Sequence, residues 1–197
     1  PRTSYLNHIK LEENAPKIGQ DFSSYRFNQL EGEGTFGIAT AGISATYTRE
    51  VLHHCGKAGK FLKIATANPF PEALALRFLE GLEKVVVIEE LDPVIENALI
   101  HLCGKYHLPT VIHGKLDGTV QPAGENSVES VAGVLEKFLP VQMPKKPELP
   151  TPPPLPVRPP VLCAGCPHRA SFYAVKKALK GRKAVFCGDI GCYTLGN

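Results

Sequence analysis

The residues best suited to chemistry are two cysteines, Cys163 and Cys166, separated by Ala164 and Gly165. Two thiolates at this spacing can face one metal ion or one side of a cluster. Pro167 follows and is typical of the first turn of a helix. The Cys166 thiolate is therefore expected beside open backbone N–H groups, which favour its ionised form.

A third cysteine, Cys192, lies on a glycine-rich turn after the next apolar segment. In a parallel β-α-β unit both strands end at the same sheet edge, so Cys192 is placed to be a third ligand. An iron-sulfur cluster usually takes four cysteines, and the fourth would lie outside this chain. Two other interpretations remain open: a zinc site that adds Cys187, and small buried cysteines without a metal.

Basic residues follow the cysteine pair directly. His168 and Arg169 stand at the expected helix start, and their position beside the cysteines suits Arg169 to an anionic ligand. The five Lys and Arg residues between 176 and 183 are expected to form a solvated helix face. Because aromatic residues do not alternate with these cations, the pattern does not favour nucleic-acid binding.

The elements that position these residues follow from apolar periodicity. Four buried strands are expected, at 36–42, 61–66, 85–88 and 110–113. Four helices should alternate with them, at 44–54, 72–82, from 93 and at 127–139. We expect Ser44 and Asp92 to cap the first and third of these helices. Alternation of this kind predicts an α/β domain over 35–140, with a mostly parallel sheet and helices on both faces.

Two further patterns in this domain are only weak indicators of function. Gly37 and Gly42 precede a helix, yet they match neither the dinucleotide nor the P-loop fingerprint. Glu89 and Glu90 end a strand, where open α/β sheets bind ligands. We expect one of these acids to cap the next helix and the other to face water.

Composition divides the chain further. Residues 1–34 are polar and read as a connector. Residues 141–160 are a proline-rich linker. In residues 161–197, short strands at 161–162 and 184–186 flank a helix at 167–180, which predicts the first β-α-β unit of a second domain. Residues 1–140 hold 13 Lys and Arg against 17 Asp and Glu, while residues 141–197 hold 9 against 2, so the basic excess is local.

The sequence shows no membrane span and no export signal, and six cysteines are too few for a disulfide scaffold. We therefore expect a cytoplasmic protein that binds no membrane. The chain also reads as a piece of a longer protein, because its second domain stops soon after it begins.

The cysteine motifs carry a resemblance to a known family. Residues 161–169 (VLCAGCPHR) and 188–196 (GDIGCYTLG) resemble the start of the thiamine diphosphate domain in the alpha subunit of indolepyruvate ferredoxin oxidoreductase. Residues 85–96 (VVVIEELDPVIE) resemble that subunit's middle domain, which is similar to the C-terminal domain of transketolase. Residues 1–34 would then be the tail of a preceding pyrimidine-binding domain.

The resemblance implies an oxidative decarboxylation. Indolepyruvate or another aryl 2-oxoacid, coenzyme A and oxidised ferredoxin would give the acyl-coenzyme A, carbon dioxide and reduced ferredoxin. Thiamine diphosphate with Mg²⁺ would supply the chemistry, and iron-sulfur clusters would carry the electrons. A beta subunit would complete a hetero-oligomer, and this chain alone would be inactive.

The resemblance also assigns residues. Cys163, Cys166 and Cys192 match ligands of a 4Fe-4S cluster, whereas Cys187 matches none, which weakens the zinc interpretation. Ala164 replaces the proline usual between such cysteines. The positions matched to the thiamine diphosphate region are His168, Arg169, Gly188, Asp189 and Gly191. No catalytic residue is assigned to this chain.

Overall fold

A computed structural model describes residues 2–56, 59–140, 143, 151, 153–157, 159–187 and 190–196. The chain divides into two compact units, residues 1–146 and residues 147–197. The first unit contains a sheet with helices, and the described residues of the second form one α-helix and one short 3₁₀ helix.

The sheet of the first unit has five strands. They are β1 (Gln29–Glu31), β2 (Phe36–Ala41), β3 (Lys60–Ile64), β4 (Lys84–Ile88) and β5 (Val111–His113), arranged in the order β1-β3-β2-β4-β5. The pairs β3-β2, β2-β4 and β4-β5 are parallel, and only β1 runs antiparallel to its neighbour. The predicted mostly parallel sheet is confirmed, with β1 added from residues that the sequence assigned to the connector.

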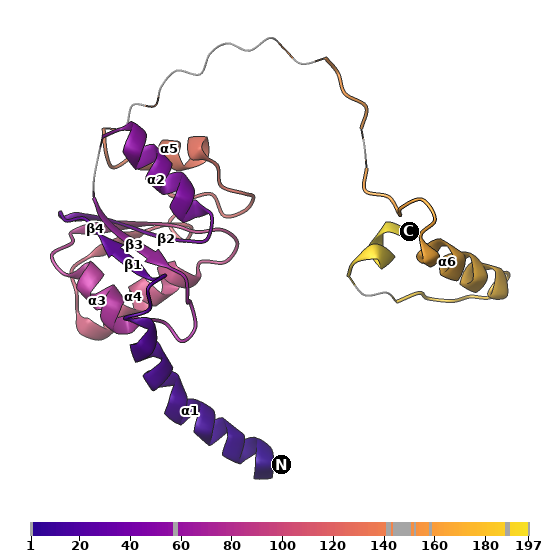
Figure 1. Cartoon of the computed structure of the whole chain (residues 1–197), viewed down its shortest axis with the longest axis horizontal. Helices are drawn as coiled ribbons and strands as arrows, with labels where there is room; N and C mark the ends of the chain where they lie inside the picture. Colours follow the sequence, from indigo (N-terminus) through magenta and orange to yellow (C-terminus); the bar gives the residue numbers. More distant parts are fainter. Residues whose placement is uncertain are drawn as a thin grey trace. The chain divides into compact units, whose positions relative to one another are not determined.

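Helices cover both faces of the sheet, as predicted (Figure 1). On one face lie α2 (Ser44–His54) and α5 (Val128–Leu135). On the other face lie α3 (Glu72–Leu79) and α4 (Val94–Tyr106). The helix after β2 and the helix after β4 therefore leave their neighbouring strands toward opposite faces.

The apolar run of β4 supplies both halves of the core. Val85 and Val87 pack in the cluster under α3 and α4, while Val86 and Ile88 pack in the cluster under α2 and α5. All four side chains are at most 1% exposed. Because successive residues of a strand point to opposite faces, only a continuous apolar run can satisfy a sheet that is covered on both sides.

Gly37 has a packing role rather than a phosphate-binding one. A Cβ at this position would lie 2.4 Å from Leu82 Cδ1 and 2.7 Å from the Phe78 ring. No real side chain tolerates such contacts, so the absent side chain lets α3 pack closely on β2.

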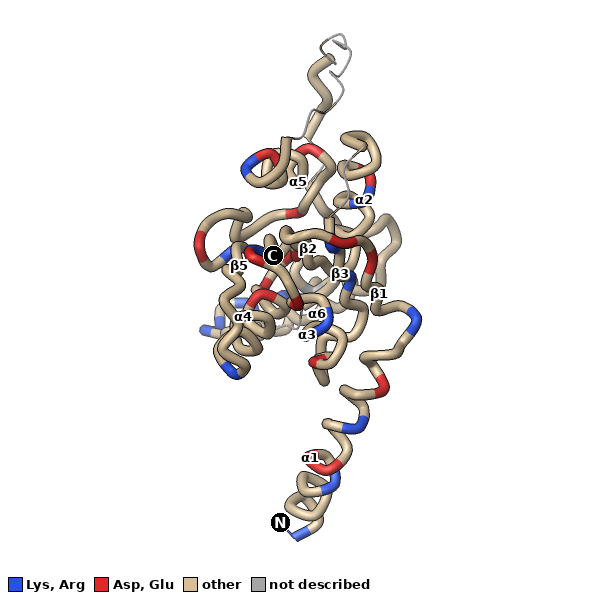
Figure 2. Tube along the Cα trace, turned by 90° about the vertical axis from the view of Figure 1, so that its left-hand side faces the viewer, with Lys and Arg blue, Asp and Glu red and all other residues tan. Residues whose placement is uncertain are grey.

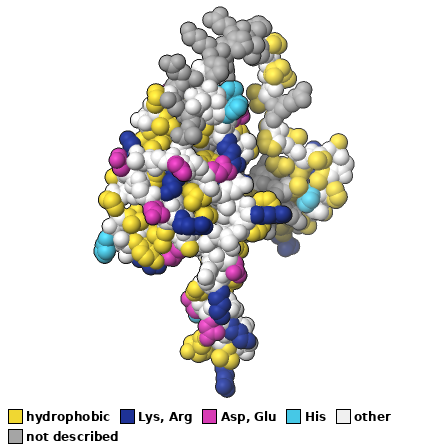
Figure 3. All heavy atoms as spheres, turned by 60° about the vertical axis from the view of Figure 1, so that its left-hand side comes forward, with side chains coloured by type: hydrophobic (Ala, Val, Ile, Leu, Met, Phe, Trp, Pro, Cys, Tyr) yellow, Lys and Arg dark blue, Asp and Glu magenta, His cyan; other side chains and the backbone are white. Residues whose placement is uncertain are grey.

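The first helix, α1 (Arg2–Phe22), occupies most of the segment expected as a connector. Acidic and basic residues are both spread along it (Figure 2), and hydrophobic atoms lie among them at its outer end (Figure 3). Of its residues, all of which are described, only Gly19 is buried. Pro16 stands inside this helix, and a proline in a helix interior argues against a helical prediction.

The second unit forms the predicted helix but not the predicted strands. Its helix α6 (Pro167–Ala178) agrees closely with the expected range, and η1 (Cys192–Gly196) follows. The described residues 161–162 and 184–186 are not in strands. Two short strands and one helix cannot bury a core, so the expected β-α-β unit lacks the neighbouring strands that would stabilise it.

No helix within the described ranges is long and apolar enough to cross a membrane.

Candidate functional site

The two cysteines predicted to act together lie in a tight turn that leads into α6. The backbone N–H of Cys166 donates to the Cys163 carbonyl at 3.2 Å, and Gly165 between them has φ +74°. Only glycine adopts that left-handed conformation without strain, so Gly165 is what closes the turn. Cys166 is the N-cap of α6, followed by Pro167 in the first turn, as predicted.

The side chains of His168 and Arg169 fold back onto this turn. His168 Nδ1 lies 3.2 Å from Cys166 Sγ. The Arg169 guanidinium donates to the carbonyl of Leu162 at 2.7 Å and to that of Cys163 at 3.3 Å. Arg169 therefore holds the cysteine turn in this structure, a role that its position in the sequence did not indicate.

Cys192 begins η1, which packs against α6. Cys163, Cys187 and Cys192 are exposed and Cys166 is half-buried, so the interpretation as small buried cysteines is wrong. Gly191, before Cys192, has φ +137°, a value that favours glycine. Gly188 and Asp189, both predicted to bind the cofactor, lie outside the described residues.

The predicted ligands do not form an assembled metal site. Within the described part of the chain, no three His, Cys, Asp or Glu side chains lie close enough together to hold one metal ion. The chemistry of the donors suits iron or zinc, but their arrangement does not yet fit either. The arrangement does not fit thiamine diphosphate either. Arg169 is one of its predicted ligands, but the Arg169 guanidinium already donates to two carbonyls of its own turn.

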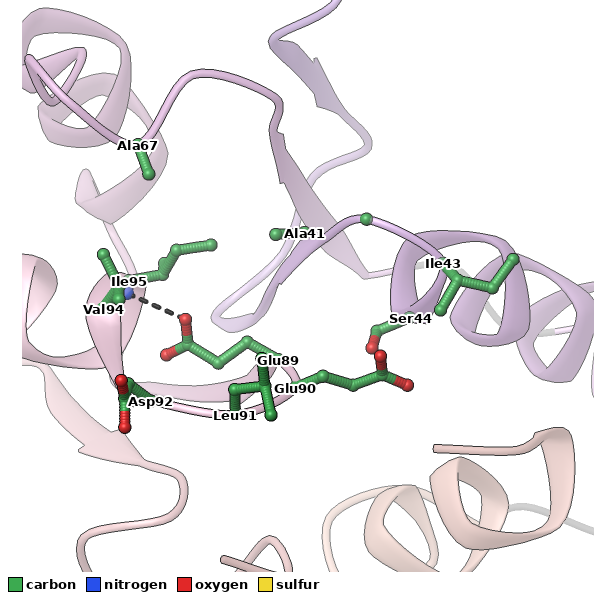
Figure 4. Close-up of a pocket in the computed structure, with 11 residues that line it drawn as sticks. Ala41, Ile43, Ser44, Ala67, Glu89, Glu90, Leu91, Asp92, Val94 and Ile95 are labelled. Atoms are coloured by element: carbon green, nitrogen blue, oxygen red, sulfur yellow. Dashed lines mark hydrogen bonds between the residues drawn. The ribbon is translucent and has the colours of Figure 1, made fainter. Parts of the chain in front are cut away.

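A second group of polar residues gathers in the first unit, where β2 and β4 end. This edge is the topological switch point of the sheet, because β2 and β4 are neighbours whose following helices cover opposite faces. Open α/β sheets bind their ligands at such places. Glu89 and Glu90 follow β4 directly and extend in opposite directions, toward α4 and toward α2 (Figure 4).

Glu89 caps α4, which confirms one of the two expectations for this acid pair. Its carboxylate accepts from the backbone N–H of Ile95 at 2.9 Å and of Glu96 at 3.0 Å. Burial raises the pKa of Glu89, and these two hydrogen bonds oppose that rise. Asp92 is not the cap, because Glu89 reaches the same N–H groups from the end of the strand.

Glu90 does not simply face water. Its carboxylate accepts from the backbone N–H of Asn126 at 2.9 Å, and the Asn126 side chain donates to Ser44 Oγ at 2.9 Å. Ser44 is fully buried and lies inside α2, whose N-cap is Ile43, so Ser44 does not cap the helix as expected. This network ties the ends of β2 and β4 to the segment before α5.

Sequence reasoning also missed Glu96, a carboxylate that is only 1% exposed on α4. It accepts from the backbone N–H of Lys115 at 2.8 Å and of Leu116 at 3.2 Å. A Cβ on Gly114 would lie 2.5 Å from this carboxylate, so the loop fits only a glycine there. The sequence did contain a signal for this contact. Glu96 stands among the apolar residues of its helix, and Gly114 directly follows a strand.

A cavity of about 370 Å³ opens at the switch point, and we call it the switch-point pocket. Eleven residues line it: Ala41, Gly42, Ile43, Ser44, Ala67, Glu89, Glu90, Leu91, Asp92, Val94 and Ile95 (Figure 4). Gly42 has φ +54°, and a Cβ there would meet open space. The lining of the pocket is mostly apolar and includes the acidic residues Glu89, Glu90 and Asp92.

Comparison with known proteins identifies relatives along the whole chain. The "Indolepyruvate oxidoreductase subunit IorA" of Methanothermobacter thermautotrophicus is 33% identical over all of this chain. Proteins of the same name from Thermococcus kodakarensis and Archaeoglobus fulgidus are 37% and 35% identical over 96% and 94% of it. The chain is therefore a homologue of this subunit. It spans about a third of the length of these curated relatives, and the resemblance predicted from the cysteine motifs is confirmed.

Other comparisons add less. No protein-family model matches the chain. Among solved structures, a chain described as "Split gene transketolase, inactive beta4 tetramer" aligns with 58% of this chain and with 41% of its own length. The TM-score is 0.43 and the sequence identity 21%. The α/β assignment rests on the strand order and on the helices that cover both faces.

Proposed function

We propose that this chain is part of the alpha subunit of a thiamine diphosphate-dependent oxidoreductase. The enzyme would convert indolepyruvate and other aryl 2-oxoacids to acyl-coenzyme A and pass the electrons to ferredoxin. The observation that carries this proposal is identity of 33–37% to indolepyruvate oxidoreductase subunits along nearly the whole chain. A beta subunit and the remaining two thirds of the alpha subunit would complete the enzyme, which would work in the cytoplasm.

The two units would have different tasks. The first unit has a continuous core on both faces of its sheet, and it would serve as a scaffold and as a contact surface for other subunits. The second unit would contribute to the cofactor site. Its predicted cofactor residues are His168, Arg169, Gly188, Asp189 and Gly191.

A 4Fe-4S cluster held by Cys163, Cys166 and Cys192 is part of the proposal. Support comes from the cysteine turn at the start of α6 and from the packing of η1, which begins with Cys192, against that helix. The fourth ligand would come from outside this chain. Because the three cysteines are not assembled in the structure, we derive no electron-transfer step through them.

The test uses the complete alpha subunit, purified anaerobically with its beta subunit. We expect reduction of ferredoxin that requires both indolepyruvate and coenzyme A, and we expect none from the 197-residue chain alone. Cys163→Ser and Cys192→Ser should each lose bound iron and the visible thiolate-to-iron absorption. Cys187→Ser is the matched control, since Cys187 is an exposed cysteine of the same unit and should be dispensable.

Three outcomes would contradict these expectations. A colourless protein that contains zinc, and loses it in Cys187→Ser, would favour the zinc site instead of the cluster. Unchanged iron content in Cys163→Ser and Cys192→Ser would remove both residues from the ligand set. Absence of ferredoxin reduction by the complete enzyme would overturn the proposed activity.

A further inference from the structure

The second unit carries a strong excess of positive charge. Residues 149–188 hold seven Lys and Arg and no Asp or Glu. The ion pairs found among the described residues all lie in the first unit, as between Arg49 and Glu31 and between Lys105 and Glu72. Cations on a surface without acidic neighbours produce a positive potential, and this potential attracts negatively charged partners.

The cations gather on one side of α6. Residues three and four positions apart share a face of a helix, so Tyr173, Lys176, Lys177 and Lys180 in the closing turn lie along one side. We call these four residues the basic face. All four are exposed, Tyr173 by 68%. The Lys177 ammonium lies 5.9 Å from the centre of the Tyr173 ring, as expected for neighbours on one face.

Another side of α6 is partly covered within the same unit. His168, Phe172 and Leu179 are half-buried and lie about a third of a turn away from the basic face. The short helix η1 packs against α6, and the basic face stays open. Cations near a helix C-terminus offset the helix dipole, but Arg182 and Lys183 continue the run beyond the helix. The dipole therefore does not account for the whole run.

A small acidic protein suits this surface better than a nucleic acid does. Single-stranded nucleic acids need several aromatic side chains on which bases stack, and Tyr173 is the single aromatic residue of the basic face. The face is about 10 Å long, from Tyr173 to Lys180. Transient electron-transfer complexes bury little area and depend on complementary charge, so they fit a face of this size. Ferredoxins, the acceptors in the proposed reaction, are small acidic proteins.

We propose that the basic face of α6 is the docking surface for ferredoxin. The lysine ammonium groups would meet carboxylates of ferredoxin, and Tyr173 would pack within the contact. Because α6 begins at the cysteine turn, Lys177 lies about 16 Å from Cys166 along the helix axis. A docked ferredoxin would therefore lie near the proposed cluster. The inference rests on the proposed oxidoreductase function, but docking is measured without turnover.

The test measures binding of an acidic 4Fe-4S ferredoxin to the complete enzyme, alpha and beta subunits together, by biolayer interferometry. The parent enzyme should bind with a Kd on the order of micromolar at low salt. Raising the salt concentration from about 20 mM to about 200 mM should weaken binding about tenfold, because salt screens the charges. Lys176→Glu, Lys177→Glu and Lys180→Glu together should weaken binding at low salt at least about tenfold and remove most of the salt dependence.

The matched control reverses three cations on another exposed helix. Arg2, Lys10 and Lys17 are exposed on α1, and their joint replacement by Glu changes the net charge equally. This control should keep the Kd for ferredoxin within about twofold of the parent value. Tyr173→Ala should weaken binding about threefold without altering its salt dependence, because it removes contact area but no charge.

A second readout shows whether the variants are intact. Methyl viologen is a small cationic electron acceptor that needs no acidic docking contact. Its reduction with indolepyruvate and coenzyme A should be unchanged in every variant. A single-stranded oligonucleotide, tested in the same binding assay, should bind the parent enzyme more weakly than ferredoxin does.

Each of four results would overturn the docking surface. The triple lysine variant could bind ferredoxin as tightly as the parent at low salt, or the α1 control could lose binding equally. The triple variant alone could lose methyl viologen reduction, which would place the basic face against the rest of the enzyme. The oligonucleotide could also bind more tightly than ferredoxin and lose this binding in the triple variant. If the parent reduces neither acceptor, the proposed activity fails, whereas charge-dependent binding of ferredoxin would still support the docking surface.

Discussion

The two units of this chain use their apolar residues in opposite ways. In the first unit, β4 buries every residue from Val85 to Ile88 between two layers of helices. In the second unit, none of the twelve described residues of α6 is buried, and Val185 and Phe186 are 90% and 65% exposed. Apolar content alone therefore does not make a core, because a core also needs enough neighbouring elements to cover it.

The comparison also separates two kinds of functional prediction. The first unit positions its carboxylates by hydrogen bonds that cross from one element to another, as between Glu90 and Asn126. The second unit positions its cysteines through a local turn, with Gly165 and Arg169 as its supports. Local turns can be predicted from neighbouring residues, whereas contacts between distant elements need the fold.

The largest expected difference between the units is in their response to loss of an aromatic ring. Phe78→Ala removes a completely buried side chain from the core under α3 and should lower the free energy of unfolding by about 3–5 kcal/mol. Tyr173→Ala removes a side chain that is 68% exposed on α6 and should change it by about 0.5 kcal/mol or less. Urea unfolding followed by circular dichroism measures both, and comparable losses would abolish the distinction between the units.

A smaller effect should show that packing in the first unit extends into its loops. Gly114→Ala places a Cβ against the Glu96 carboxylate and should lower the free energy of unfolding by about 1–3 kcal/mol. The control is Gly133→Ala in α5, where a Cβ meets open space and the change should be neutral or slightly stabilising. If the conflict with Glu96 is the cause, adding Glu96→Ala should make the Gly114→Ala substitution less costly than it is alone. Strict additivity of the two changes would count against this explanation.

The smallest expected effect is a pH dependence that comes from Glu89. Burial raises the pKa of Glu89 above its ordinary value near 4.5. The folded state then holds the proton more tightly than the unfolded chain, so this contribution to stability is complete below about pH 4.5 and is lost as the pH rises through the raised pKa. Glu89→Gln cannot ionise, and its free energy of unfolding relative to the parent protein should increase with pH over that window. Urea unfolding at several pH values checks this, and a constant difference would show that the pKa is not raised.

Much of the first unit could be predicted because the spacing of its apolar residues shows which side chains pack in the core. The helix over 44–54 and the strand over 85–88 agree with α2 and β4 almost residue for residue, since periodicity reports which face is buried. The helix α1 was not predicted, because its segment is polar and includes Pro16, a residue that normally ends or kinks a helix. The strands at 161–162 and 184–186 were predicted from composition, but the described residues give them no sheet to join.

The candidate sites were predictable to a different degree. The turn from Cys163 to Cys166 is local, and the start of α6 agrees with the sequence prediction, although the Cys166 side chain makes no capping hydrogen bond. Ser44 and Asp92 were predicted as caps, yet nearby residues take those places: Ile43 stands at the N-cap of α2, and Glu89 reaches the first turn of α4 from the end of β4. Contacts such as that between Asn126 and Ser44 join residues 82 positions apart, a separation at which local patterns carry no information.

The contact between Glu96 and Gly114 has an evolutionary consequence. The carboxylate fills the space that a side chain at position 114 would need, and its hydrogen bonds fix the loop that follows β5. Neither residue can change alone without loss of fit, so the two positions should vary together among homologues. A relative with alanine or serine at position 114 is expected to carry a shorter residue at position 96, together with a different loop after β5.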